Sequence, residues 1–242
     1  MTAFILVYGQ ERIPYEVAFD PKRTSRVAIH VNPDGSVAVD APPGFDDNSI
    51  RTAVQKRARW VVDHVNDARD RHAHVLTKEY VSGEQIIYLG RRYVLKVIPV
   101  DTKPRLVGLK GNRLEVETRT GSTADIRGRL RGWYRAKGRD YFDRRIKSLS
   151  GELPWVTSIP KFRLLDMSRQ WGSCSTEGEI ILNTHLIKAP RACIDYVIIH
   201  EMAHLKHHDH GPAFWQLING HIPGWRETKR KLDGLVEVLL TE

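Results

Sequence analysis

The stretch APRACIDYVIIHEMAHLK, residues 189–206, decides how the chain is expected to fold. Pro190 suits the first turn of a helix, and apolar residues recur after it every three or four positions. The first half of the stretch is apolar on every side, so the sequence predicts a buried helix. Into this helix it places His200, Glu201 and His204, which form the pattern H-E-x-x-H.

The spacing of these two histidines indicates a metal site. Residues i and i+4 lie one turn apart on one helical face, which lets two imidazole nitrogens reach one Zn²⁺ at about 2.0–2.1 Å. Glu201 would lie close enough to accept a proton from water without binding the metal. The alternative is a pair of hydrogen-bonded histidines near a helix end. Burial of polar side chains is unfavourable unless something binds them, and a metal would do so.

Three histidines farther along are candidates for a third ligand. His207 and His208 would lie about 10.5 and 12 Å from His200 along an unbroken helix, too far to share one ion with both other histidines. His210 is followed directly by a Gly-Pro pair, which is typical of a chain that leaves one helix and starts another. We therefore expect His210 to complete the site.

Toward the N-terminus from this helix, the predicted secondary structure changes near residue 121. Residues 1–121 are strand-rich and contain one amphipathic helix, whereas residues 122–242 contain the H-E-x-x-H helix. The run Arg119–Thr123 (RTGST) is the expected linker. The sequence thus predicts two domains of the α+β class, and no internal repeat is evident in it.

Local patterns place the other elements. A hairpin is expected over 26–39, around an Asn-Pro-Asp-Gly turn. Helical spacing predicts a helix over 49–68, capped by Asn48, and a second helix over 124–149. Further short strands are expected at 86–88, 93–100, 105–109 and 114–116.

The composition limits the class of protein. The 242 residues carry 38 Lys and Arg against 29 Asp and Glu, a formal net charge of +9. Nine of the basic residues lie between Arg127 and Lys147, on either a solvated helix face or a face that contacts nucleic acid electrostatically. Two cysteines cannot form a disulfide framework, and no apolar run reaches the roughly 18 residues of a membrane span. Because the start does not read as a signal peptide, we expect a cytoplasmic protein without membrane contact.

Residues 200–215, HEMAHLKHHDHGPAFW, resemble the metal site of the YgjP-like metallopeptidases and are similar to that of the SprT-like proteases. Upstream, RQWGSCS (169–175) and the Leu182-Asn183 pair match the block that precedes the helix in both groups. The specific match covers roughly 165–225. The resemblance implies a strand-rich N-terminal region followed by a zincin-like metalloprotease domain.

Carried over to these residues, the resemblance implies one Zn²⁺ on His200, His204 and His210, with Glu201 as general base and a polypeptide as substrate. It also implies a strand, Ile180–Asn183, near the cleft, where backbone hydrogen bonds would hold an extended peptide. Four residues are candidates for contacts to the substrate or the transition state: Arg169, Asn183, Tyr196 and His221. For Arg169, a structural salt bridge is an equal alternative.

The leading expectation is therefore a zinc-dependent metallopeptidase. One alternative is a metal-dependent hydrolase of nucleotides or other phosphoanhydrides, but the sequence has no G-x-x-x-x-G-K loop and no carboxylate-rich Mg²⁺ site. The other is a DNA-associated, SprT-like protease, for which residues 127–147 would supply the basic contact. Two cysteines cannot supply the Cys₄ or Cys₂His₂ ligand set of a zinc finger.

Overall fold

A computed structural model gives the structure of residues 2–21, 23–32, 35–73, 78–167 and 170–240. The chain divides into two compact units, Met1–Leu76 and Thr77–Glu242. Each unit encloses its own cluster of buried apolar side chains. The boundary expected between residues 121 and 122 therefore falls inside the second unit, and the packing of the strands that precede it explains why.

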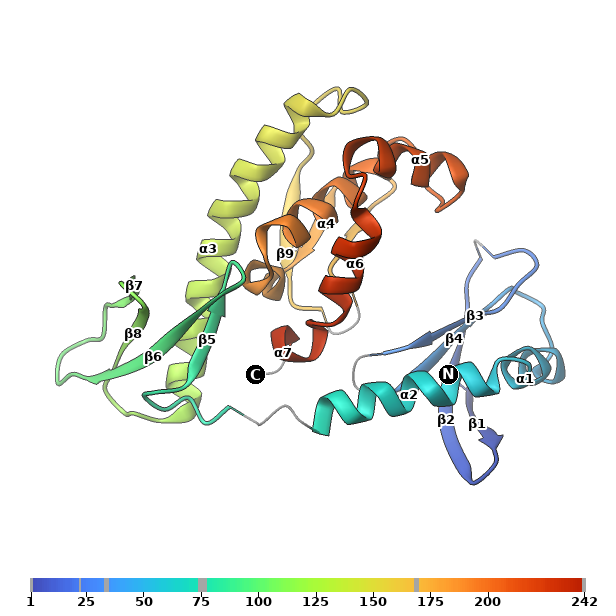
Figure 1. Cartoon of the computed structure of the whole chain (residues 1–242), viewed down its shortest axis with the longest axis horizontal. Helices are drawn as coiled ribbons and strands as arrows, with labels where there is room; N and C mark the ends of the chain where they lie inside the picture. The colour runs from blue at the N-terminus through green and yellow to red at the C-terminus, as the bar shows by residue number, and fades with distance from the viewer. Residues whose placement is uncertain (1, 22, 33–34, 74–77, 168–169, 241–242) are drawn as a thin grey trace. The chain divides into compact units, whose positions relative to one another are not determined.

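The first unit is a four-stranded sheet covered by two helices (Figure 1). Its elements are β1 (Thr2–Tyr8), β2 (Glu11–Phe19), β3 (Ala28–Val31), β4 (Val37–Ala41), α1 (Asp47–Gln55) and α2 (Ala58–Ala73). The strands are ordered β1-β2-β4-β3, with an antiparallel hairpin on each side and β2 parallel to β4. The hairpin predicted over 26–39 is confirmed as β3 and β4.

The helix expected over 49–68 is interrupted and forms α1 and α2. Asp46, rather than Asn48, caps α1, because its carboxylate accepts the backbone N–H of Ser49 at 2.7 Å. The helical spacing nevertheless identified the buried face correctly. The apolar residues that recur at helical spacing in this range are fully buried: Ile50, Val54, Val61 and Val65.

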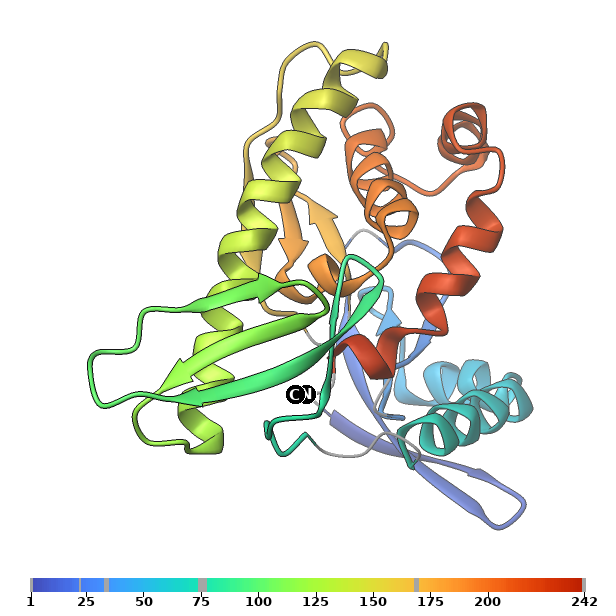
Figure 2. The same cartoon turned by 60° about the vertical axis from the view of Figure 1, so that its left-hand side comes forward.

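The second unit begins with another four-stranded sheet, ordered β5-β6-β8-β7. Its strands are β5 (Gln85–Tyr88), β6 (Arg91–Pro99), β7 (Val107–Lys110) and β8 (Arg113–Thr118). Figure 2 shows this sheet crossing the N-terminal half of the long helix α3 (Thr123–Glu152). Leu95 and Leu114 are fully buried in the same cluster as the apolar side chains of α3 and of the H-E-x-x-H helix.

The expected linker 119–123 is a tight turn that fixes α3 to β8. Ser122 caps α3 by accepting the N–H of Asp125. The Thr118 hydroxyl donates to the Asp125 carboxylate at 2.6 Å and accepts the N–H of Gly121 at 2.9 Å. Small polar residues here make hydrogen bonds instead of a flexible connection, so residues 85–118 belong to the second unit.

The rest of the second unit is a three-stranded sheet and five short helices. They are β9 (Phe162–Leu165), β10 (Gly172–Cys174), β11 (Ile180–Asn183), η1 (Thr184–Lys188), α4 (Arg191–Ala203), α5 (Pro212–His221), α6 (Trp225–Asp233) and α7 (Val236–Leu240). The strand order is β10-β11-β9, so the strand expected to hold a peptide, β11, is paired on both sides. The backbone of β11 is therefore hydrogen-bonded on both sides, and β9 and β10 are the edge strands of this sheet.

Helix α4 contains His200 and Glu201 of the H-E-x-x-H pattern. It ends at Ala203, three residues earlier than expected, and His204 is its C-cap. Among the described residues of α4, nine side chains are buried, in agreement with the predicted burial. The chain then turns, and α5 begins at Pro212 with Gly211 as its cap, at the Gly-Pro pair that predicted a new helix.

The nine basic residues of 127–147 lie on α3, and at least four of them have acidic partners within the unit. These pairs are Arg129–Asp125, Arg131–Asp166, Arg145–Asp195 and Lys147–Asp143. Such pairs reduce the positive charge that this helix presents to a polyanion. Of the described helices, none is long and apolar enough to cross a membrane.

Candidate metal centre

Three histidines from two neighbouring segments converge at the end of α4. His200 lies in the last turn of α4, His204 at its C-cap, and His210 directly before α5. One ring nitrogen from each lies within 4.8 Å of the others, and in the described part of the chain no other group of His, Cys, Asp and Glu side chains has this geometry. His207 and His208 are not part of the cluster.

The distances and protonation states in the cluster suit a metal ion. The Nε2 atoms of His200 and His210 are 3.0 Å apart, close to the roughly 3.3 Å expected of two nitrogens on one tetrahedral zinc. Burial, with the nearby His210 and His204, lowers the pKa of His200 to about 3. Burial also lowers the pKa of His204 and of His210. All three rings are therefore neutral near pH 7, which is the form that binds metals.

A backbone contact orients one of the rings. The Nδ1–H of His204 donates to the carbonyl of His207 at 3.0 Å, which leaves Nε2 to face the cluster. His207 thus contributes its carbonyl group rather than its side chain. The Nδ1 atom of His200 is buried and has no hydrogen-bond partner among the described residues.

Aromatic side chains surround the exposed histidine of the cluster. The ring of His210 lies 4.8 Å from that of Phe214 and 5.7 Å from that of Trp215. Trp215 stacks on Trp225 of α6 at 4.3 Å, and Trp225 stacks in turn on Tyr196 of α4 at 6.4 Å. Sequence reasoning missed this stack, because its members become neighbours only when α4, α5 and α6 pack together.

Glu201 is buried beside the cluster, with only 5% of its surface exposed. Burial raises the pKa of its carboxyl group to about 8. Its side chain lies against the edge strand β10, since a Cβ atom added to Gly172 would lie 2.8 Å from Glu201 Oε1. A larger residue at position 172 would therefore displace the Glu201 side chain.

The four further candidates for substrate contacts differ in their burial and in their distance from the histidine cluster. Asn183 is fully buried, and its amide group donates to the carbonyls of Met167 and Gln170 and accepts the N–H of His185. Its interactions therefore hold the chain before β10 and leave nothing for a substrate. Arg169 lies outside the described residues.

Tyr196 and His221 differ in their proximity to the cluster. The ring of Tyr196 lies 5.9 Å from that of His200, and burial, with nearby Asp233 and Glu201, raises its pKa to about 12. His221 lies at the end of α5, where Nδ1–H donates to the Leu217 carbonyl and the ring packs on Trp155. Of the two, only Tyr196 has a ring contact with the described histidine cluster.

Comparison with known families agrees with this geometry. A family model described as the YgjP-like metallopeptidase domain matches residues 25–234, most of the chain. The chain belongs to the YgjP-like metallopeptidase family. The match runs through both compact units and includes the histidine cluster, so the resemblance inferred from the sequence is confirmed. Membership of this family supports a metal-dependent peptidase.

Other comparisons are more limited. Among solved structures, the chain is similar to the metallopeptidase zymogen of Pyrococcus abyssi abylysin, with 22% sequence identity and a TM-score of 0.34. That similarity covers 36% of this chain and 88% of the other. A search of curated proteins gave no match.

Proposed function

We propose that this YgjP-like protein is a zinc metallopeptidase with one Zn²⁺ held by His200, His204 and His210. The observation that carries the proposal is the convergence of three neutral imidazoles beside a buried carboxyl group. Three histidines leave a fourth tetrahedral position open, as in catalytic rather than structural zinc sites. When bound, the zinc would supply a Lewis acid for the scissile carbonyl and the attacking water.

Glu201 is the proposed general base. It accepts a proton from the attacking water and later delivers that proton to the leaving amine of the cut peptide. Burial raises the pKa of Glu201 to about 8 in the metal-free protein, and the positive charge of a bound zinc would shift the carboxyl group toward the ionised form that accepts a proton. The contact with Gly172 limits where the carboxylate can lie.

The proposed substrate is an extended polypeptide chain on the free edge of β10. Only β11 pairs with β10 in the described sheet, which leaves one edge of β10 for backbone hydrogen bonds to a peptide. Because β10 also contacts Glu201 through Gly172, a peptide bound there would run past the base. The proposed peptide-binding strand is therefore β10, in place of the strand Ile180–Asn183 that the sequence suggested.

The alternatives receive less support. No cluster of carboxylates suited to Mg²⁺ occurs among the described residues, which disfavours a nucleotide hydrolase. The acidic partners of α3 disfavour the nucleic-acid contact that a DNA-associated protease would use. The two free cysteines, Cys174 and Cys193, support a reducing compartment such as the cytoplasm.

Measuring bound zinc together with hydrolysis tests the proposal. Glu201→Gln should retain zinc and lose hydrolysis of an unstructured polypeptide such as casein, whereas His204→Ala should lose both. His208→Ala, an exposed histidine outside the cluster, is the matched control and should retain both. Full peptide hydrolysis by Glu201→Gln, or turnover of nucleoside triphosphates in place of peptides by the zinc-loaded protein, would overturn the proposal.

A further inference from the structure

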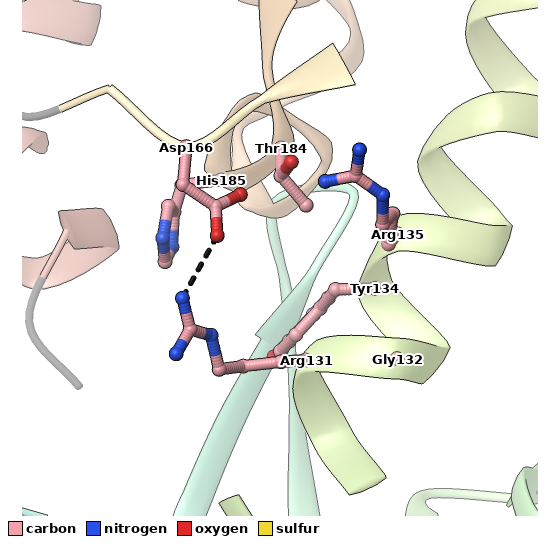
Figure 3. Close-up of a pocket in the computed structure, with 7 residues that line it drawn as sticks. All are labelled: Arg131, Gly132, Tyr134, Arg135, Asp166, Thr184 and His185. Atoms are coloured by element: carbon pink, nitrogen blue, oxygen red, sulfur yellow. Dashed lines mark hydrogen bonds and ion pairs between the residues drawn. The ribbon is translucent and has the colours of Figure 1, made fainter. Parts of the chain in front are cut away.

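A cavity in the Thr77–Glu242 unit has none of the proposed metal ligands in its lining. Its volume is about 200 Å³, and α3, the end of β9 and η1 enclose it (Figure 3). The proposed peptidase mechanism makes no use of this cavity.

The η1 wall of the cavity carries a buried hydroxyl group, that of Thr184, and Tyr134 of α3 is also buried in the lining. The Tyr134 hydroxyl donates to the carbonyl of Ile87 at 2.8 Å. The Thr184 Oγ1 atom makes no hydrogen bond of 3.5 Å or less in the described part of the chain, and its longer approach to the Asp166 carboxylate helps to lower the pKa of that group. A buried hydroxyl without a partner is unfavourable, so a ligand that accepts its hydrogen bond would be stabilised.

The opposite wall carries two arginines, one turn apart on α3. In Figure 3 the side chains of Arg131 and Arg135 extend from the helix on the side of Asp166 and Thr184. Arg135 donates to the carbonyl of Leu164 at 3.1 Å, which uses one of the five N–H donors of its guanidinium group. Arg131 pairs with the carboxylate of Asp166 at 2.8 Å.

The remaining ionisable group of the lining is uncharged near neutral pH. Burial, helped by the nearby ammonium group of Lys188, lowers the pKa of His185 to about 4. Two guanidinium groups therefore face one carboxylate across the cavity. This balance favours an anionic ligand over a cation.

We propose that the cavity binds a phosphate group, either as the free ion or as a phosphomonoester, between the two arginines of α3 and Thr184. Guanidinium groups match the oxygens of phosphate and form strong, charge-assisted hydrogen bonds with them. The donors approach from two walls, α3 and η1, and a tetrahedral oxyanion meets such divergent donors better than a planar carboxylate does. Asp166 acts against the ligand, because it competes for Arg131 and repels the negative charge.

Calorimetric titration of the full-length chain tests this site. Inorganic phosphate and phosphoserine are titrated at pH 7.5 against chloride of the same ionic strength, with both zinc-loaded and chelated protein. Arg135→Gln and the near-isosteric Thr184→Val should weaken binding, the former roughly tenfold or more. Arg139→Gln, an exposed arginine of α3 outside the cavity, is the matched control and should bind like the wild type. Thermal melting of each variant shows that it is folded.

Asp166→Asn gives a test with the opposite sign. Removing a like charge from the rim should tighten phosphate binding, whereas a purely structural network would give weaker binding for every change in it. Equal responses to phosphate and chloride, or equal binding by Arg135→Gln and Arg139→Gln, would overturn the proposal. Binding by chelated protein separates this site from zinc, so its failure is distinguishable from failure of the peptidase mechanism. Stronger binding of phosphoserine than of phosphate would assign the site to organic phosphomonoesters.

Discussion

The two four-stranded sheets of this protein have one topology but different surroundings. The order β1-β2-β4-β3 in the first sheet corresponds to β5-β6-β8-β7 in the second, and in each the second strand is parallel to the fourth. Both begin with a hairpin closed by a two-residue turn after a tyrosine, Tyr8 and Tyr88. The second sheet therefore repeats the first.

The helices that follow the two sheets extend the correspondence. Asp46 caps α1 and Ser122 caps α3, each through a hydrogen bond to the N–H three residues later. Four residues after each cap comes a buried isoleucine, Ile50 or Ile126. The sequence showed no repeat because the equivalent positions share burial and capping rather than residue identity.

The difference between the repeats lies in what shares their core. The first sheet shares its core with α1 and α2, and the second with α3, the three-stranded sheet and α4. In the second repeat, the turn after Tyr88 donates two backbone hydrogen bonds to η1, from Leu89 to the Ile187 carbonyl and from Gly90 to the Lys188 carbonyl. The same small fold thus forms a compact unit by itself or shares a larger core with the helix of His200, according to how its turn and helix are packed.

Truncation is the strongest test of this contrast. We expect residues 78–242 to fold cooperatively and to bind zinc, because both sheets of the second core are retained. Residues 122–242 should not fold, since the core would lose Ile86, Leu95, Leu114 and Val116. Circular dichroism and urea unfolding of the two fragments provide the measurement. Cooperative unfolding of 122–242 would restore the boundary expected from the sequence.

The second test uses the buried charged side chains: among the described Asp, Glu, Lys and Arg residues, Lys188 and Glu201 are buried, and both lie in the second unit. In chelated protein, the pKa of Glu201 rises from 4.5 in the unfolded chain to about 8 in the folded one. The folded state then binds more protons, so the stabilisation is complete below pH 4.5 and is lost as the pH rises through 8.

Glu201→Gln should therefore stabilise the chelated second unit at pH 8 by an amount on the order of several kcal/mol, with little effect at pH 4.5. Urea unfolding of wild type and variant at pH 4.5, 6.5 and 8 measures the difference, which cancels the contributions of the histidines. The first unit, whose described buried polar side chain is Asn32, should unfold equally in both proteins. A difference that does not change with pH would contradict a raised pKa.

The third test compares equivalent hairpin turns. Gly9 and Gly90 both have positive φ angles, 61° and 74°, so alanine would be strained by about 1 kcal/mol at either position. A Cβ atom on Gly90 would also lie 2.8 Å from Pro190 Cα, directly before α4, whereas one on Gly9 would meet nothing within 4 Å.

We expect Gly9→Ala to lower the free energy of unfolding by about 1 kcal/mol and Gly90→Ala by about 2–4 kcal/mol. Zinc affinity should fall only in Gly90→Ala, because the backbone that must shift leads into the helix of His200. Denaturant unfolding and zinc titration of both variants give the comparison. Equal losses in the two variants would show that the second turn does not brace α4.

The sequence predicted the parts of this protein that depend on local geometry. The i, i+4 spacing placed His200 beside His204, and the Gly-Pro pair after His210 marked where the chain returns to them. Burial of α4 and the faces of α1 and α2 followed from helical periodicity in the same way. These inferences need only a few consecutive residues.

The features that the sequence did not predict depend on contacts between residues far apart in the chain. β11 is central because β9, which lies before β10 in the chain, pairs with it in parallel, and no local pattern reports such a partner. Asn183, at the end of this central strand, is buried and hydrogen-bonds the carbonyls of Met167 and Gln170. The run Arg119–Thr123 has the composition of a linker, but hydrogen bonds from Thr118 and Ser122 make it a turn.

The smallest expected effect concerns the aromatic rings beside histidines in the two units. On α2, Trp60 lies 4.2 Å from His64, which belongs to no cluster of candidate metal ligands among the described residues. In the second unit, Trp215 lies 5.7 Å from His210. His210 is exposed, lies outside any helix, and has His200 as its hydrogen-bond partner in the described structure. Its position therefore depends on ring packing, and Trp215 is itself held by stacking on Trp225.

Trp215→Ala should release His210 to sample other positions and so weaken zinc binding roughly tenfold, a typical effect for residues that orient a ligand. Trp215→Phe keeps an aromatic face and should retain most of the affinity, while Trp60→Ala should leave zinc binding unchanged. Competition with a chelating dye measures all three. If Trp215→Ala binds zinc as tightly as wild type, His210 is ordered by its backbone alone, and the stack from Tyr196 to Trp215 serves only to join α4, α5 and α6.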